Sequence, residues 1–197
     1  MVFFYIEAAE HPAAPDAASP RRRVARSIFS IMIIRFTEKL SKKLKLGKIT
    51  KVEKFPGSYL DWYAHLFSFQ RTQYIITTEA HSLYTTVIYG RGIVDDNRFI
   101  QQFMSLLQDQ LEDIDCQIIF ERIIAPKSHQ ITMSKTINKS VLGSMNDMVS
   151  MSKLMLDRDD MGPIELAEML NKTPFKYIEY QRPIDAFKGL KLRKNAV

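Results

Sequence analysis

Apolar residues recur at two different spacings along this chain, and each spacing predicts its own kind of element. Residues 32–36 form a short apolar run, and residues 62–69 place apolar side chains on both faces of an extended strand. Residues 73–78 and 83–89 are rich in β-branched and aromatic residues, which favour strands. Because only short turns separate these last three segments, we predict that they pair as an antiparallel meander.

Helical spacing governs other parts of the chain. Thr37 is positioned to cap a helix over residues 38–46, in which leucines occupy one face and lysines the other. A longer helix is predicted to begin at a cap formed by Asp95 or Asp96 and to end near residue 113. Its expected buried stripe consists of Phe99, Phe103, Leu106, Leu107 and Leu111.

The second half of the chain continues this mixture of elements. Residues 116–124 are compatible with either a strand or a helix, and residues 130–136 predict a strand. A Met-rich helix is expected over residues 140–156, and Pro163 suits the first turn of another helix that ends near residue 170. The order of strands and helices predicts a single α+β domain, with a mixed or antiparallel sheet packed against helices.

Composition divides the chain into three parts. Residues 1–31 are rich in Ala and Pro and predict a disordered N-terminal extension. Residues 32–185 are expected to form the α+β core, and residues 186–197 a basic C-terminal tail. Met32 is then a possible natural start, and a targeting peptide is the other interpretation of the extension. Its acidic residues argue against a transit peptide: Glu7, Glu10 and Asp16.

Charge is unevenly distributed over a chain whose formal net charge is +6. Residues 35–54 hold eight Lys or Arg residues against Glu38 and Glu53, which gives this segment a net charge of +6. Such a segment can attract polyanions, and it can equally be a solvated helix face. Aromatic residues that could stack on bases are not interleaved with these lysines, so nucleic-acid binding is possible but weakly supported.

Compartment and membrane association follow from simpler features. No apolar run approaches the roughly 18 residues needed to span a bilayer, so we expect no membrane partner. Cys116 is the single cysteine, which excludes an intramolecular disulfide and is consistent with a reducing cytoplasm. We therefore predict a soluble protein with a cytoplasmic location.

Four short segments together resemble an uncharacterised bacterial family described as a domain of unknown function. The most specific is the run SVLGSMND at residues 140–147. The other three are MIIR at residues 32–35, WYAHLF at residues 62–67 and LNKTP at residues 170–174. The resemblance covers about residues 32–190, which supports Met32 as the start of the domain. It implies no activity, cofactor or site residue.

The junction before the SVLGSMND run offers the first candidate site. A strand that leads into a helix presents free backbone N–H groups that can hold an anion. Lys135, Asn138, Ser140 and Asn146 are the candidate ligand-binding residues, and Lys135 would add positive charge. The alternative is that Asn138 or Ser140 only caps the helix, because capping requires the same residue types.

His65 and Asp147 are the candidate catalytic residues. His65 is predicted to lie in the middle of a strand, and it could act as a general base if Asp147 or Glu79 lies beside it. The alternative for His65 is a hydrogen-bonded residue on a half-buried sheet. We expect Asp147 to be at least half buried and bonded to a residue outside its own helix, since a buried carboxylate needs a partner.

Metal ligation is not predicted. His81 and His129 lack a second ligand at zinc-binding spacing. Residues 157–168 place oxygen ligands at several positions of a calcium-loop pattern, but Met161 stands where another oxygen is required. We therefore predict no metal and no cofactor.

These observations favour a binding or interaction module whose partner is an unknown protein or a small anionic ligand. The alternative is a hydrolase or transferase acting on a phosphorylated or nucleotide substrate. It would use His65, Lys135, Ser140 and Asp147. A pocket that joins His65 to Asp147 would favour the enzyme, whereas an exposed Met face would favour the binding module.

Overall fold

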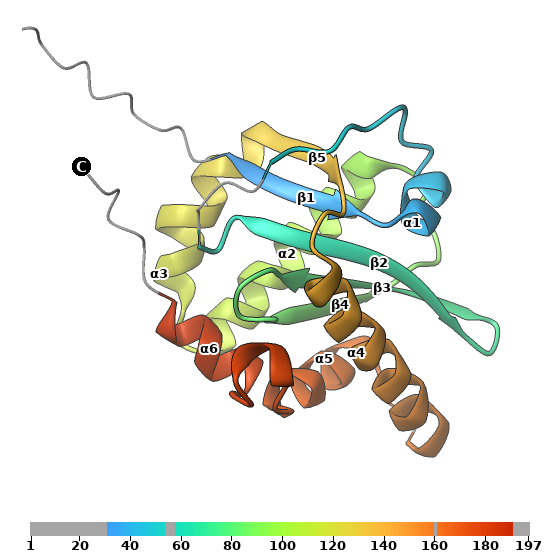
Figure 1. The fold of residues 1–197 in the computed structure, drawn as a ribbon, viewed down its shortest axis with the longest axis vertical. Helices are drawn as coiled ribbons and strands as arrows, with labels where there is room; N and C mark the ends of the chain where they lie inside the picture. Colours follow the sequence, from blue (N-terminus) through green and yellow to red (C-terminus); the bar gives the residue numbers. More distant parts are fainter. Residues whose placement is uncertain (1–30, 54–57, 160, 191–197) are drawn as a thin grey trace, which may run out of the picture.

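The computed structural model describes residues 31–53, 58–159 and 161–190, which form one sheet with helices on both of its faces (Figure 1). Within these residues the sheet has five strands in the order β4-β3-β2-β1-β5. The strands are β1 (Met32–Phe36), β2 (Asp61–Phe69), β3 (Thr72–Glu79), β4 (Thr85–Tyr89) and β5 (Ile131–Lys135). β2, β3 and β4 form the predicted antiparallel meander, whereas β1 runs parallel to both β2 and β5. The sheet is therefore mixed, and the predicted α+β class is confirmed.

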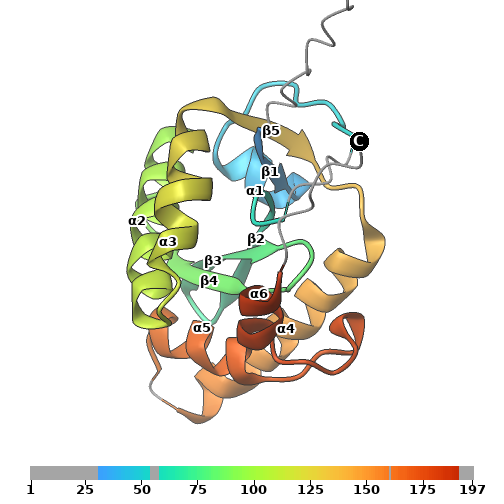
Figure 2. The ribbon, with the colours of Figure 1, turned by 90° about the vertical axis from the view of Figure 1, so that its left-hand side faces the viewer.

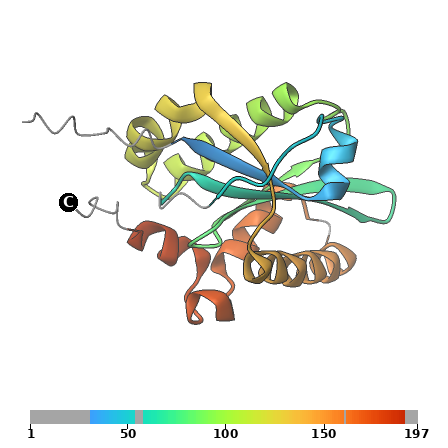
Figure 3. The ribbon, with the colours of Figure 1, turned by 45° about the horizontal axis from the view of Figure 1, so that its top comes forward.

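The helices form two layers with the sheet between them (Figure 2, Figure 3). One layer contains α2 (Asp96–Asp113), α3 (Gln117–Ile119), the π-helical turn η1 (Phe120–Ile124) and the 3₁₀ segment η2 (Ala125–Gln130). The other layer contains α4 (Lys139–Arg158), α5 (Pro163–Lys172), the 3₁₀ turn η3 (Lys176–Ile178) and α6 (Pro183–Gly189). The short helix α1 (Glu38–Lys43) lies in the connection between the parallel strands β1 and β2.

α2 packs on the sheet through the predicted apolar stripe. Asp95 caps the helix by accepting a hydrogen bond from the backbone N–H of Arg98 at 2.8 Å. The ring of Phe103 meets Trp62 of β2 edge to face at a centroid separation of 5.1 Å. Four of the five predicted stripe residues are fully buried, and Leu106 is only partly buried: Phe99, Phe103, Leu107 and Leu111. Gln110 lies on the same buried face and is the polar exception there.

α4 covers the opposite face of the sheet with its apolar side. Val141, Met145 and Met148 are buried against Tyr63 and Phe67 of β2. The predicted Met series is therefore core at Met145 and Met148, and only partly buried further along the helix. α5 lies beside the edge strand β4 and adds its own apolar residues to this second core, where Leu166, Ala167 and Leu170 are fully buried.

Element ends differ from the sequence predictions where backbone geometry decides them. α1 ends at Lys43 rather than residue 46, since Lys45 adopts a left-handed φ of 53°. Residues 117–124, left open between strand and helix, are helical. α6 includes residues 186–189, and Phe187 is fully buried, so this part of the predicted tail packs on the core. Residues 1–30 and 191–197, which hold most of the predicted extension and tail, lie outside the described residues.

Arg35 of β1 joins the parallel part of the sheet through a buried guanidinium whose three nitrogens all donate hydrogen bonds. Its Nε and Nη2 atoms donate to the two carboxylate oxygens of Asp61 at 2.7 and 3.1 Å. Its Nη1 donates to the carbonyl of Val52 at 2.8 Å and to the hydroxyl of Ser134 at 3.3 Å. Burial raises the pKa of Asp61, and the bonds and charge of Arg35 oppose that rise. Arg35 thus connects β1 to β2, to β5 and to the loop before β2.

Glu79 organises the turn between β3 and β4 in a similar way. Its buried carboxylate accepts hydrogen bonds from the backbone N–H and Nδ1 of His81, both at 2.9 Å. It also accepts from the backbone N–H and the hydroxyl of Ser82, both at 2.7 Å. The Glu79 carboxylate therefore holds His81 and Ser82 in the turn.

Candidate functional site

Asn138 caps α4, which agrees with the simpler interpretation of the junction. Its side-chain oxygen accepts hydrogen bonds from the backbone N–H groups of Ser140 and Val141 at 2.9 and 3.3 Å. Its Nδ2 donates to the hydroxyl of Tyr177 at 3.4 Å, and its backbone N–H donates to the hydroxyl of Tyr63 at 3.2 Å. The N–H groups that were expected to hold an anion are thus partly used within the protein.

Asp147 is exposed, so the prediction that it is at least half buried is wrong. The physical reason is the helical period of 3.6 residues. Met145, Met148 and Val149 face the sheet, which places Asn146 and Asp147 on the solvent side of α4. Ser140 is also exposed, so three polar residues of the SVLGSMND segment face solvent, whereas Ser144 is buried and donates a hydrogen bond to the Ser140 carbonyl at 3.2 Å.

His65 is a partly buried residue of β2 on the face that α4 covers. Its Nδ1 lies 3.2 Å from the hydroxyl of Thr37, which makes no capping bond to α1. Burial lowers the pKa of His65, and the positive charges of Lys39 and Lys153 lower it further. The imidazole is therefore held neutral near pH 7. The contact with Thr37 resembles a structural hydrogen bond more than the arrangement of a catalytic base.

Lys135 lines a cavity of about 330 Å³, which we call the lysine hollow. The hollow lies where the basic segment 35–54 meets the end of β5. Its lining residues are Phe36, Glu38, Ser41, Ile49, Lys51, Lys135 and Thr136. Lys42 and Glu38 form an exposed ion pair, with Nζ 2.6 Å from Oε1. Of the four predicted ligand-binding residues, Lys135 alone lines one of the three cavities described here.

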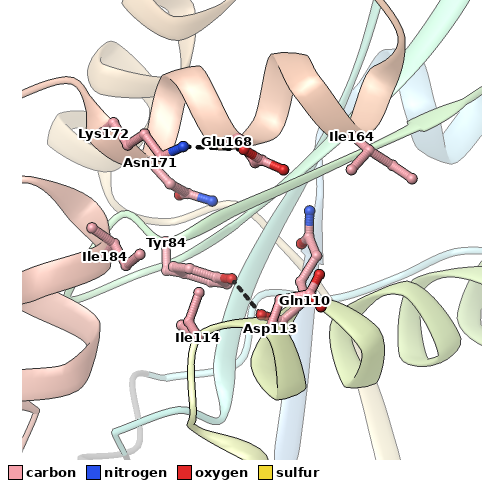
Figure 4. Close-up of a pocket in the computed structure, with 9 residues that line it drawn as sticks. All are labelled: Tyr84, Gln110, Asp113, Ile114, Ile164, Glu168, Asn171, Lys172 and Ile184. Carbon is pink, nitrogen blue, oxygen red and sulfur yellow. Dashed lines mark hydrogen bonds and ion pairs between the residues drawn. The ribbon is translucent and has the colours of Figure 1, made fainter.

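A second cavity lies between α2, α5, α6 and the start of β4, and we call it the α2–α5 pocket (Figure 4). Its volume is about 310 Å³. It is lined by Tyr84, Gln110, Asp113, Ile114, Ile164, Glu168, Asn171, Lys172 and Ile184. None of these is among the binding residues predicted from the sequence. Polar and apolar groups from three helices converge here, which is typical of a small-molecule site.

Gln110 is the most informative residue of the α2–α5 pocket. The residue is only 6% exposed, and its side-chain oxygen Oε1 is buried without a hydrogen-bond partner. Figure 4 shows its side chain projecting from α2 into the space below α5. Thr77 also has a buried hydroxyl without a partner, but it lines none of the three cavities described. A polar residue inside an apolar helix stripe was the sequence signal that could have revealed Gln110.

The remaining polar groups of this pocket are partly engaged. Both atoms of the Asn171 amide bond the backbone of Thr85, each at 2.8 Å, so this side chain completes the outer edge of β4. The Tyr84 hydroxyl lies 3.5 Å from the backbone carbonyl oxygen of Gln110, which is long for a hydrogen bond. Burial raises the pKa of Tyr84, which keeps the phenol neutral. Lys172 pairs with Glu168 at 3.1 Å.

A third cavity, on the exposed C-terminal half of α4, is broader and less enclosed. Its volume is about 640 Å³, and its lining residues are Met151, Leu154, Met155, Asp157 and Arg158. Leu154 is 72% exposed. This surface is the exposed part of the predicted Met face, and it contains neither His65 nor Asp147.

The fold and the α2–α5 pocket define, at the level of class, an α+β protein with a cavity at the edge of its sheet that is lined by polar and apolar residues. Residues 33–186 match the model of the family described as Domain of unknown function (DUF6933). The chain belongs to this family. Neither the curated proteins nor the solved structures yielded a match.

Two features are absent from the part of the chain that the structure describes. Within residues 31–53, 58–159 and 161–190, no helix is both long enough and apolar enough to cross a membrane. Over the same residues, His, Cys, Asp and Glu side chains do not gather in groups of three or more that could hold a metal ion.

Proposed function

We propose that this protein is a binding module that takes up a small molecule in the α2–α5 pocket. The observation that carries the proposal is the buried side chain of Gln110, which lines a cavity of about 310 Å³ and whose Oε1 has no hydrogen-bond partner. A buried acceptor without a partner costs about 1–3 kcal/mol. Native proteins usually keep such a group only where water or a ligand satisfies it.

The size and lining of the pocket support a ligand larger than one water molecule. A water molecule takes up about 30 Å³ in the liquid, far less than the cavity offers. Ile114, Ile164 and Ile184 give the pocket apolar walls against which water gains little. The Tyr84 hydroxyl and the Gln110 amide supply the few polar contacts that orient a ligand.

The alternative enzyme has weaker support. It requires His65, Lys135, Ser140 and Asp147 around one substrate. His65 contacts Thr37, Lys135 lines the lysine hollow, and Ser140 and Asp147 lie on the exposed side of α4. None of the contacts described for these four residues joins two of them. A small anionic ligand, if bound, suits the lysine hollow better than the α2–α5 pocket, because Lys51 and Lys135 both line the hollow.

A fragment screen tests the proposed function. Small amines, alcohols, amides and carboxylates would be added to the full-length protein while ¹H–¹⁵N NMR spectra are recorded. We expect at least one class to shift the signals of residues that line the α2–α5 pocket.

Two matched variants locate the binding. Ile164→Trp places a large ring at the half-exposed rim of the pocket and should abolish these shifts. Leu154→Trp makes a similar change on the exposed surface of α4 and should leave them intact. Shifts confined to the lysine hollow or to the α4 surface, or no shifts at all, would overturn the proposal.

A further inference from the structure

We propose, resting on the proposed function, that the ligand of the α2–α5 pocket carries a protonated amine on a short apolar body. The charged groups of the pocket lining set this class. Asp113 and Glu168 bring two carboxylates, and Lys172 brings one ammonium group, which is already paired with Glu168 at 3.1 Å. The formal charge of the lining is therefore −1, which attracts a cation and repels an anion.

The C-terminal end of α2 adds to this negative field. Helix carbonyls leave about half a negative charge at a C-terminus, and Lys or Arg in the last turn usually balances it. The last turn of α2 has no basic residue and contains Glu112 and Asp113 instead. Gln110, Asp113 and Ile114 all line the pocket from this end of the helix.

Two further observations point to a ligand rather than to a merely acidic surface. The Gln110 side chain projects into the cavity, and its oxygen is a neutral acceptor that is buried without a hydrogen-bond partner (Figure 4). Burial is the main cause of the raised pKa of the Tyr84 phenol, and the charges of Asp113 and Glu168 add to it, so these charges act on the interior of the cavity as well as on its rim. An ammonium group has three donors and no acceptor, which matches this set of acceptors.

Lys172 then has a specific role as a resident counter-ion. Its Nζ donates a hydrogen bond to the Glu168 carboxylate. An incoming ammonium group would compete with Lys172 for that carboxylate, while the isoleucines contact the apolar body of the ligand. Phosphates and carboxylates would meet Asp113 and Glu168 and be excluded.

Three probes of nearly equal shape test the class: hexylamine, 1-hexanol and hexanoate, each titrated into the full-length protein by NMR at low salt. We expect hexylamine to bind at least tenfold more tightly than 1-hexanol, and hexanoate not to bind. Asp113→Asn and Glu168→Gln should each weaken hexylamine binding about tenfold, which corresponds to about 1.4 kcal/mol. The preference of the pocket for hexylamine over 1-hexanol should fall with each change.

Two variants sharpen the test. Glu165→Gln removes an exposed carboxylate from the same helix but outside the pocket lining, and should change hexylamine affinity less than twofold. Lys172→Met removes the competing cation and should tighten hexylamine binding. Raising the salt concentration should weaken hexylamine and leave 1-hexanol unchanged.

The outcomes separate the two proposals. If 1-hexanol or hexanoate binds in the pocket as tightly as hexylamine, the amine class is wrong and the binding module stands. If hexylamine shifts signals only outside the pocket lining, the amine class is again wrong. If no probe or fragment of any class reaches the pocket, both proposals fail.

Discussion

Arg35, in the sheet, and Gln110, in the helix α2 that packs on it, are both buried polar residues, but they differ in how their side chains are hydrogen-bonded. Each guanidinium nitrogen of Arg35 donates at least one hydrogen bond within the protein, to Asp61, Val52 or Ser134. The Gln110 side chain lines a cavity, and its oxygen is buried without a hydrogen-bond partner. A satisfied buried group indicates a structural role, whereas an unsatisfied one in a cavity indicates a place for a ligand.

The largest effect on stability should come from a substitution of Arg35. Arg35→Met removes one partner of a buried ion pair and leaves the Asp61 carboxylate buried and unpaired. We expect a loss of about 3–5 kcal/mol in the free energy of unfolding, measured by urea denaturation. Adding Asp61→Leu to Arg35→Met should recover much of that loss. A cost below about 1 kcal/mol for the single variant would show that the pair is not structural.

The next effect concerns Asn171, the pocket residue whose side-chain amide bonds the backbone of β4. Asn171→Leu leaves the backbone N–H and C=O of Thr85 without their partners at the edge of β4. The expected cost is about 1–3 kcal/mol in urea denaturation. The control is Asn146→Leu on the exposed side of α4, which should stay within about 0.5 kcal/mol of the wild type. Equal effects of the two changes would refute the edge-completing role of Asn171.

The lowered pKa of His65 predicts that the stability of the protein depends on pH. Its folded-state pKa is lowered, chiefly by burial, so the unfolded chain binds a proton at a pH where the folded protein does not. The stabilising contribution is complete above the unfolded pKa of about 6.5. It is lost as the pH falls from there through the folded pKa.

Urea denaturation at pH 7 and pH 5 measures this dependence. His65→Gln should lose less stability than the wild type between the two pH values, and exposed His129→Gln should behave like the wild type. The interpretation fails if all three proteins lose stability equally.

The smallest effect is expected in the segment that the sequence singled out. Asp147→Ala changes an exposed residue on the solvent side of α4. Surface substitutions of this kind usually stay within about 0.5 kcal/mol, and thermal unfolding should show little change. A loss above about 1 kcal/mol would mean that Asp147 has a partner that the structure does not show.

Local patterns predicted the elements of this fold well. The meander of β2, β3 and β4 followed from alternating residues and short turns, and α2 followed from its cap at Asp95 and its aromatic stripe. The parallel pairing of β1 with β2 and β5 could not be derived locally, because its partners are separated by long connections. Short-range spacing does not encode which distant strands become neighbours.

The candidate site was less accessible from the sequence. Gln110, Glu168 and Ile184 come from three helices, so only the tertiary structure brings them into one cavity. The exposure of Asp147 could have been predicted, because Met145 and Met148 define the buried side of α4. A neutral polar residue in an apolar helix stripe, such as Gln110, was a better indicator of the cavity than the SVLGSMND motif.

The proposed ligand site depends on Gln110, whose buried side chain lines the α2–α5 pocket. The most direct measurement is the free energy of unfolding of Gln110→Leu and of the wild type, each with and without hexylamine. Without ligand, we expect the variant to match the wild type or exceed it by up to about 1 kcal/mol, because an unsatisfied buried acceptor is removed. Hexylamine should stabilise the wild type and have little effect on the variant. A variant that is clearly destabilised, yet is stabilised by hexylamine as much as the wild type, would contradict the account.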